Sequence, residues 1–176
     1  MVEEFQEQGI SPVRDNSDVA RVLGQVAGLL EFRNENSFKV RSYSMAAETI
    51  SSMSKPVVEI AAQGGAEELQ KIPGIGKSIS AQIVEIIGTG KSSYLQSLAQ
   101  ETPVSVLELR RVSGIGLKTA QVLYKDFGIK SLEELRTFAE GGGLTSVPGL
   151  GEKTAARITR SLSRLESQSG SAEGAP

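Results

Sequence analysis

Apolar residues recur every three or four positions through most of this chain, which is the spacing of an amphipathic helix. The clearest run predicts a first helix over about 16–32, and a later run predicts a second around Val40, Tyr43, Ala46, Ala47 and Ile50. β-Branched residues also fall at a spacing of three or four rather than two, so no strand is expected. The pattern therefore predicts an all-α fold.

Glycine, proline and one capping signal divide this pattern into separate helices. Pro56 suits the first turn of a third short helix, which Gly64 and Gly65 should end. The apolar residues Ile79, Ile83, Ile86 and Ile87 predict another helix, stopped by Gly88 and Gly90. Ser131 followed three residues later by Glu134 forms a capping box that opens a further helix.

One short motif occurs three times, and each copy precedes an amphipathic helix. It reads IPGIG at 72–76, VSGIG at 112–116 and VPGLG at 147–151, which we name the first, second and third hairpin turns. The first glycines of the three copies are 40 and then 35 residues apart. Such a period indicates three copies of one supersecondary unit, the helix-hairpin-helix.

A Gly-aliphatic-Gly turn followed at once by a helix has the chemistry of an anion site. Glycine allows positive φ and close approach of the backbone, so both glycines of each pair are expected to serve the turn in this way. The first N–H groups of the helix have no intrahelical partner and lie at the positive end of its dipole. The middle residues Ile75, Ile115 and Leu150 are expected to point inward and lock the turn. The predicted phosphate-binding residues are Gly74, Gly76, Lys77, Gly114, Gly116, Lys118, Gly149, Gly151 and Lys153.

The composition of the chain excludes several kinds of catalytic and metal site. The chain has no Cys and no His, which excludes disulfides, thiolate or imidazole metal sites and catalytic triads built on either residue. The formal net charge is −2, and residues 17–160 hold 17 basic against 15 acidic residues. Bulk charge therefore does not attract nucleic acid, so DNA binding has to depend on directed backbone donors and a few placed cations.

Two other functions are not expected. Gly76-Lys77 and Gly90-Lys91 resemble parts of a nucleotide-binding P-loop, but the glycine required five positions earlier is replaced by Lys71 or Glu85, so no nucleoside triphosphate is expected. No apolar run reaches the ~20 residues that span a bilayer. The acidic, polar start is unlike a secretory signal. We therefore expect no membrane association and a cytoplasmic location.

The predicted organisation is two small helical modules between two unstructured ends. Residues 1–13 are expected to be a flexible leader, and 14–92 a helical domain with the first hairpin turn. Residues 93–163 should hold the second and third hairpin turns. The Ser- and Gly-rich stretch 164–176 is expected to be a disordered tail.

Taken together, these motifs resemble the amino-terminal part of family X DNA polymerases, especially the bacterial ones. The resemblance covers about 16–163, and its signatures are FKVRSYSMAA at 38–47, the segment 72–91, the segment 111–135 and a third hairpin turn typical of the bacterial branch. It implies a lyase-like domain and a fingers-like domain that bind gapped or nicked DNA, largely without sequence preference. No cofactor is required, but the family implies a monovalent cation (Na⁺ or K⁺) held at each hairpin by backbone carbonyls. By motif position these carbonyls belong to Gln70, Ile72, Ile75, Arg110, Val112, Ile115, Thr145, Val147 and Leu150.

The chain departs from the family at both catalytic centres. The polymerase palm and its three metal-binding aspartates would follow residue 163 and are not in this sequence. The lysine that forms a Schiff base in the family's lyase corresponds to Gln82, and an amide cannot form an imine. Lys39, Arg41 and Tyr43 remain as a candidate 5′-phosphate pocket; the alternative for them is a solvated helix face with Tyr43 in the core.

The sequence thus favours a non-catalytic DNA-binding protein or module acting in DNA repair, with repair proteins as further partners. One alternative is a weak abasic-site (deoxyribose phosphate) lyase that uses Lys39, Lys77 or Lys91 in place of the missing lysine, or a truncated part of a family X polymerase. A second alternative is a helical protein-interaction module that has lost DNA binding, which the acidic overall charge favours.

Overall fold

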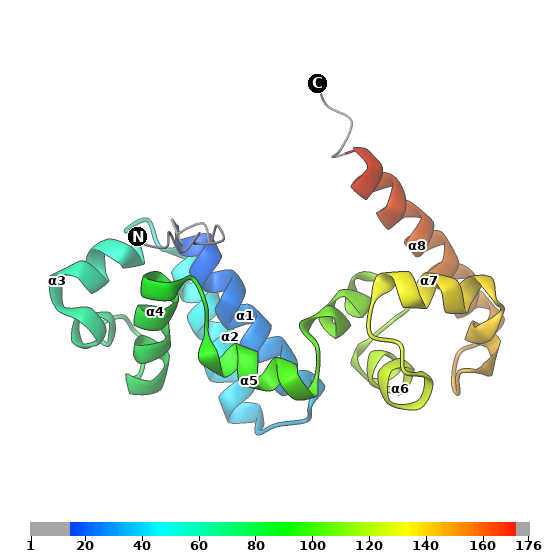
Figure 1. Ribbon diagram of the computed structural model, residues 1–176, viewed down its shortest axis with the longest axis horizontal. Helices are drawn as coiled ribbons and strands as arrows, with labels where there is room; N and C mark the ends of the chain where they lie inside the picture. Colours follow the sequence, from blue (N-terminus) through cyan, green and yellow to red (C-terminus); the bar gives the residue numbers. More distant parts are fainter. Residues whose placement is uncertain (1–14, 172–176) are drawn as a thin grey trace, which may run out of the picture. The chain divides into compact units, whose positions relative to one another are not determined.

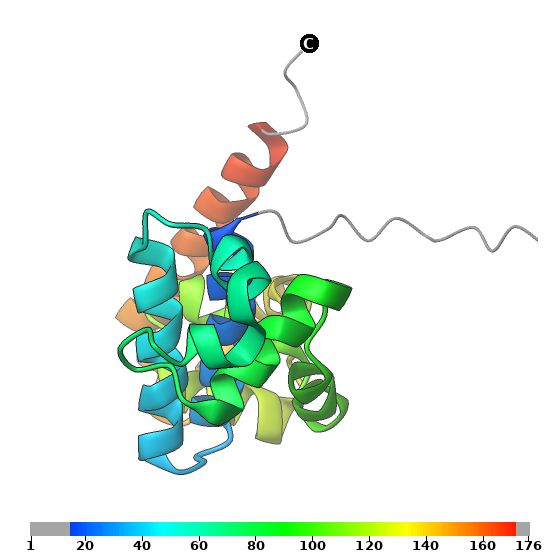
Figure 2. The ribbon, with the colours of Figure 1, turned by 90° about the vertical axis from the view of Figure 1, so that its left-hand side faces the viewer.

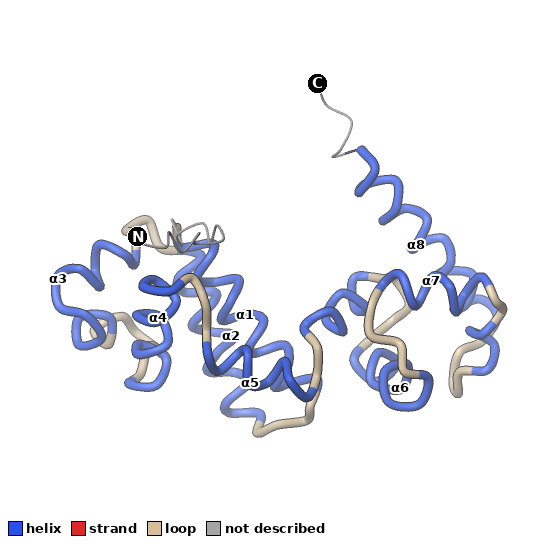
Figure 3. Tube along the Cα trace, in the orientation of Figure 1, coloured by secondary structure: helices blue, strands red, loops and turns tan. Residues whose placement is uncertain are grey.

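The computed structural model describes residues 15–171, and this part of the chain is built from helices and connecting turns with no strand (Figure 3). The prediction of an all-α fold is confirmed. The pattern of contacts divides the chain into two compact units, residues 1–101 and 102–176. The predicted leader, 1–13, lies outside the described residues.

The first unit is organised around its first helix. α1 (Asn16–Phe32) begins and ends where the sequence predicted, and Val19, Leu23, Val26 and Leu29 on it are completely buried. α2 (Ser37–Ser52) lies beside α1, as Figures 1 and 2 show. α3 (Val57–Leu69), α4 (Lys77–Thr89) and α5 (Ser93–Glu101) complete the unit.

Pro56 and the Gly64-Gly65 pair delimit a helix much as the sequence predicted. Pro56 is the N-cap of α3, and because it has no capping side chain, the Asn16 side chain accepts a hydrogen bond from the Val57 N–H at 2.8 Å. Gly64 and Gly65 have non-helical φ and ψ, so they break α3 and leave a short second piece that ends at Leu69. This short piece leads directly into the first hairpin turn.

α5 belongs to the first unit rather than to the second. We predicted a boundary after residue 92, but the contacts place it after Glu101 because α5 packs on α1. Leu98 is buried, and an ion pair joins Glu101 to Arg33 at 2.6 Å. These contacts connect residues more than 60 positions apart, so helical periodicity within α5 could not reveal them.

The second unit consists of η1 (Val104–Arg111), α6 (Leu117–Phe127), α7 (Leu132–Glu140), η2 (Gly143–Ser146) and α8 (Glu152–Ser171). η1 and η2 are 3₁₀ helices, so the segment before each hairpin turn here is more tightly wound than an α-helix. Leu109, Leu123, Leu135 and Ile158 fill the core and are completely buried.

The capping box is present with one change of partner. Ser131 is the N-cap of α7 and its hydroxyl accepts the Glu134 N–H at 3.2 Å, as predicted. The Glu134 carboxylate accepts the N–H of Lys130 at 2.8 Å, one residue before the position that the motif specifies.

The predicted disordered tail was wrong for residues 164–171, which continue α8. The core ends earlier, since Leu162 is the last fully buried residue of this helix. Beyond it, the Ser167 hydroxyl donates to the Ser163 carbonyl at 3.1 Å and the Ser169 hydroxyl donates to the Leu165 carbonyl at 3.0 Å. Within 15–171, no helix combines the length and the apolar character needed to cross a membrane.

Candidate functional site

The three hairpin turns have the same backbone hydrogen bonds. The residue between the glycines donates its N–H to the carbonyl three residues earlier: Ile75 to Ile72 at 3.0 Å, Ile115 to Val112 at 3.1 Å and Leu150 to Val147 at 3.1 Å. The second glycine of each turn then accepts the first helical bond, from Ser80, Ala120 and Ala155 respectively. Repeated sequence therefore produces repeated structure.

Positive φ occurs at the first glycine of each turn and not at the second. Gly74, Gly114 and Gly149 have φ of +86°, +101° and +81°, which matches the third position of a type II β-turn with Pro or Ser before it. Gly76 and Gly116 have φ of −90° and −92°, and Gly151 is not among the residues with positive φ. The prediction that both glycines use positive φ was therefore wrong for the second one.

The second glycine of each hairpin turn has empty space at the position where a side chain would begin. A Cβ added at Gly76, Gly116 or Gly151 would meet no protein atom within 4 Å, and the backbone of Gly76 and Gly116 is extended, as any residue can adopt. Neither strain nor crowding inside this protein requires glycine there. A ligand that approaches the helix start closely would require it.

The helices that follow the hairpin turns begin differently from others in the chain. Asp15, Asn36 and Ser131 cap α1, α2 and α7 by accepting backbone N–H groups with their side chains. Gly76 and Gly116, which precede α4 and α6, supply no side-chain cap. The first N–H groups of these two helices therefore stay open to an external acceptor, with the helix dipole favouring an anion.

An exposed lysine stands at each of these helix starts. Lys77 directly follows its glycine N-cap, whereas Lys118 and Lys153 lie one residue further along, which turns them about 100° around the helix axis. Ser78 occupies the position in the first turn that corresponds to Lys118 and Lys153. No ion pair involving these three lysines occurs within 15–171.

The residue between the glycines points into the protein, as predicted. Ile75 and Ile115 are buried, and Leu150 is half-buried. The residue that opens the turn is buried in two of the three copies, at Val112 and Val147. Apolar side chains therefore anchor each turn from inside and leave its backbone at the surface.

The second hairpin turn packs on α8, the helix that follows the third. The Ser113 N–H donates to the buried Ser161 hydroxyl at 2.9 Å. A Cβ on Gly114 would lie 3.1 Å from Ile158 and 3.4 Å from Thr154. The second and third turns thus belong to one packed tandem, whereas a Cβ on Gly74 in the first turn would meet nothing within 4 Å.

Lys39 and Tyr43 lie together with two residues from other helices. The Lys39 ammonium is 4.8 Å from the centre of the Tyr94 ring, and a side-chain hydrogen bond to Tyr94 is the main reason that the pKa of Lys39 is raised above its ordinary value. The ring of Tyr94 also lies 5.9 Å from that of Tyr43. Sequence analysis did not single out Tyr94, because no spacing rule connects α5 with α2.

Tyr43 is buried and its hydroxyl accepts a hydrogen bond from the Gln82 amide. The carbonyl oxygen of Gln82 is buried without a hydrogen-bond partner. Arg41 is exposed, and because it lies two residues from both Lys39 and Tyr43 on α2, it faces away from them. The structure thus assembles Lys39, Tyr43 and Tyr94, and it does not bring Arg41 to them as the predicted pocket requires.

The carbonyls assigned to a monovalent cation are in part already used. Those of Ile72, Val112 and Val147 each accept the N–H that closes a hairpin turn, which leaves one lone pair on each oxygen for a cation. Oxygen donors of this kind suit hard cations. No group of three or more His, Cys, Asp or Glu side chains that could hold a metal ion occurs in the described part of the chain.

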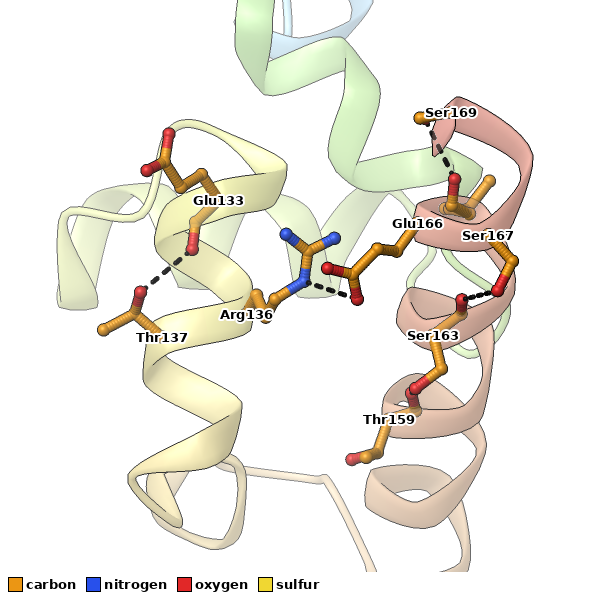
Figure 4. A network of polar contacts seen from close by, with 9 residues as sticks. Glu133, Arg136, Thr137, Thr159, Ser163, Glu166, Ser167 and Ser169 are labelled. Atoms are coloured by element: carbon orange, nitrogen blue, oxygen red, sulfur yellow. Dashed lines mark hydrogen bonds and ion pairs between the residues drawn. The ribbon is translucent and has the colours of Figure 1, made fainter. Parts of the chain in front are cut away.

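An ion pair joins α7 to α8 on a side of α8 away from Lys153 and the three arginines of this helix. Figure 4 shows Arg136 of α7 reaching Glu166 of α8, with a separation of 3.8 Å. On α8 the hydroxyl groups of Thr159, Ser163 and Ser167 donate to carbonyls one turn earlier. The ion pair thus joins two helices of the second unit, whereas the hydroxyl bonds lie within α8.

Two family models match the chain. The helix-hairpin-helix domain matches residues 14–92, and the SAM-like helix-hairpin-helix tandem matches residues 106–164. The first match ends at the boundary expected from the sequence, before α5. The second covers the packed tandem of the second and third hairpin turns.

Several curated proteins are similar over much of the chain. The DNA polymerase/3′-5′ exonuclease PolX of Bacillus subtilis (strain 168) is 30% identical over 151 residues, 86% of this chain and 25% of that protein. DNA polymerase lambda of Rattus norvegicus is 31% identical over 119 residues, 67% of this chain and 19% of that protein. The Holliday junction branch migration complex subunit RuvA of Acidovorax ebreus (strain TPSY) is 27% identical over 142 residues, 80% of this chain and 67% of that protein. The chain thus spans a quarter or less of the length of the two polymerases.

Proposed function

This chain carries helix-hairpin-helix domains homologous to the amino-terminal region of family X DNA polymerases, and from that premise we propose that it binds the DNA backbone without catalysis. The observation that carries the proposal is the set of three helix starts where a glycine stands in an open, side-chain-free position beside an exposed lysine. Each start offers N–H donors and one cation to a phosphate. Binding is then largely independent of base sequence, and its setting is DNA repair or recombination in the bacterial cytoplasm or nucleoid.

The second glycines supply the sharpest test. Replacing Gly76, Gly116 and Gly151 together by Ala adds three methyl groups where the protein itself has space, so the helices should stay folded while phosphates are pushed away. For the parent we expect a Kd for duplex DNA of ~10⁻⁴–10⁻⁶ M at physiological salt, as is usual for non-specific binding. For the triple variant we expect binding too weak to detect by fluorescence anisotropy.

A matched control uses Gly24, Gly88 and Gly170, which lie within helices away from the turns and where a Cβ also meets nothing within 4 Å. Their triple Ala variant should bind as the parent does, with circular dichroism confirming helix content in both. If the turn variant is folded and binds DNA like the parent, the hairpins serve only packing, and the alternative of a protein-interaction module takes over.

For gapped DNA, we propose that Lys39 is the cation that receives a 5′-phosphate. Its exposed ammonium is positioned by Tyr94, and Tyr94 in turn packs against Tyr43. A gap with a 5′-phosphate should bind more tightly than a gap with a 5′-hydroxyl by ~1.5–3 kcal/mol, the size of one charge-assisted contact. Lys39→Gln should abolish the difference and Arg41→Gln should leave it, so equal effects of both changes would refute this assignment.

The absence of catalysis at an abasic site is part of the proposal. Gln82 cannot form an imine, and its amide is held by the Tyr43 hydroxyl. Borohydride reduction in the presence of abasic DNA should therefore trap no adduct. An adduct that disappears in Lys39→Ala, Lys77→Ala or Lys91→Ala would instead establish a weak lyase that uses a neighbouring lysine.

We also propose that a monovalent cation supports each hairpin through its turn carbonyls. The cation would neutralise part of the charge of a phosphate held at the helix start. Replacing K⁺ or Na⁺ by tetramethylammonium at equal ionic strength should then weaken DNA binding, because the larger ion cannot approach carbonyl oxygens closely. Equal affinities in the three salts would exclude the cation from binding.

A further inference from the structure

A row of four cations follows one face of α8 beyond the third hairpin turn. Lys153, Arg157, Arg160 and Arg164 are spaced by four, three and four residues and all are exposed. At about 100° per residue they fall within an arc of about 60°, and at about 1.5 Å per residue the row is about 16 Å long. We call these four residues the α8 basic stripe.

The buried and the acidic residues of α8 lie on other faces of the helix than this stripe. Ile158 and Leu162 are buried on another face of the helix, and Ser161 beside them receives the Ser113 N–H. The two acidic residues of α8, Glu152 and Glu166, lie outside the arc of the stripe, and Glu166 pairs with Arg136 of α7. The stripe therefore presents positive charge alone.

The arginines of the stripe contrast with other arginines of the same unit. Arg111 pairs with Glu108, and Arg136 pairs with Glu166. Across 15–171, Arg157, Arg160 and Arg164 make no ion pair. Like charges three and four residues apart destabilise a helix, and cations near a helix start are opposed by its dipole. No ion pair within the described residues offsets this cost, which points to an external anion.

We propose that the α8 basic stripe binds successive phosphates of the DNA whose backbone the third hairpin turn holds. The inference rests on the proposed DNA binding and extends it from a point contact to a line of contacts. Charge complementarity selects the occupant, and guanidinium groups suit phosphate oxygens. With one phosphate per about 3.4 Å of duplex axis on each strand, a stripe of about 16 Å is long enough to reach more than one of them.

The test removes the two arginines furthest from the hairpin turn, so that the turn itself is untouched. Arg160→Gln with Arg164→Gln should weaken duplex binding about tenfold and make the slope of log K against log salt shallower by about two units. The matched control is Lys125→Gln with Lys130→Gln, which changes the net charge equally. Both control residues are exposed and lie at or beyond the far end of α6 from Gly116.

Each outcome separates the stripe from the hairpins. A loss confined to the arginine variant supports the stripe. Equal losses in the two double variants, or parent-like binding by the arginine variant, would overturn the stripe, while the glycine variants still test the hairpins. If the parent itself does not bind DNA, the proposed function fails and the stripe fails with it. Circular dichroism and thermal melting of each variant check that α8 is retained.

Discussion

The two units place the same hairpin turn in opposite electrostatic surroundings. Residues 1–101 carry nine Lys and Arg against thirteen Asp and Glu, whereas residues 102–176 carry ten against eight. The first unit has one hairpin turn and the second has two, together with the α8 basic stripe. A net charge of −2 for the whole chain thus conceals one unit that repels a polyanion and one that attracts it.

The units also differ in how tightly they hold the turn. Gly114 in the second unit is packed against Ile158 and Thr154, while Gly74 in the first has open space around it. Elsewhere in the first unit, Lys39 of α2 lies over the ring of Tyr94 of α5. We infer that the second unit supplies general backbone affinity and that the first unit recognises a particular DNA end.

The largest expected difference between the units is in stability. Gly114→Ala should destabilise the second unit by about 2–4 kcal/mol, because the cost of positive φ adds to the cost of placing a Cβ 3.1 Å from Ile158. Gly74→Ala should cost the first unit about 1–2 kcal/mol from positive φ alone. Amide hydrogen exchange measures each unit within the intact chain. Equal losses of protection in the two variants would show that packing on α8 adds nothing.

Next in size is the division of DNA affinity between the units. Gly116→Ala with Gly151→Ala should weaken binding to intact duplex about a hundredfold, and Gly76→Ala about tenfold or less, because two phosphate contacts are lost against one. Anisotropy titrations on one duplex compare them directly. A larger loss from Gly76→Ala would reverse the roles that we assign to the two units.

The lysines should affect the salt dependence more than the affinity. Lys118→Ala and Lys153→Ala should each make the slope of log K against log salt shallower by about one unit. Lys77 lies one residue earlier on its helix, so its removal should change the slope less.

Exchanging the two residues, as Lys77→Ser with Ser78→Lys, should give the first hairpin the salt dependence of the other two. An unchanged slope after this exchange would show that the register is irrelevant.

The smallest effect concerns the titration of Lys39. The hydrogen bond to Tyr94 raises the pKa of Lys39 above its ordinary value of 10.5, so its contribution to stability is complete below that pH and is lost as pH rises through the raised pKa. Tyr94→Phe should return the pKa toward 10.5, as followed by NMR of the lysine Cε and Hε signals. The parent chain, measured under the same conditions, serves as the reference. A Lys39 pKa that stays raised in Tyr94→Phe would mean that other charges set it.

The sequence by itself determined the helices and the hairpin turns, because both depend on residues close along the chain. Periodic apolar positions fixed α1, and the pattern of aliphatic residue, Pro or Ser, and Gly fixed three turns with one set of hydrogen bonds. The same pattern could not tell which glycine of a pair has positive φ, since either allows it.

The tertiary structure alone decided which distant groups meet. It placed α5 on α1, brought Tyr94 to Lys39, and set Gly114 against Ile158. It also continued α8 to Ser171, which the Ser-rich sequence had argued against. The first three outcomes depend on side-chain contacts between separate helices, and the last depends on how far a helix propagates once its first turns are packed. A local sequence pattern contains neither kind of information.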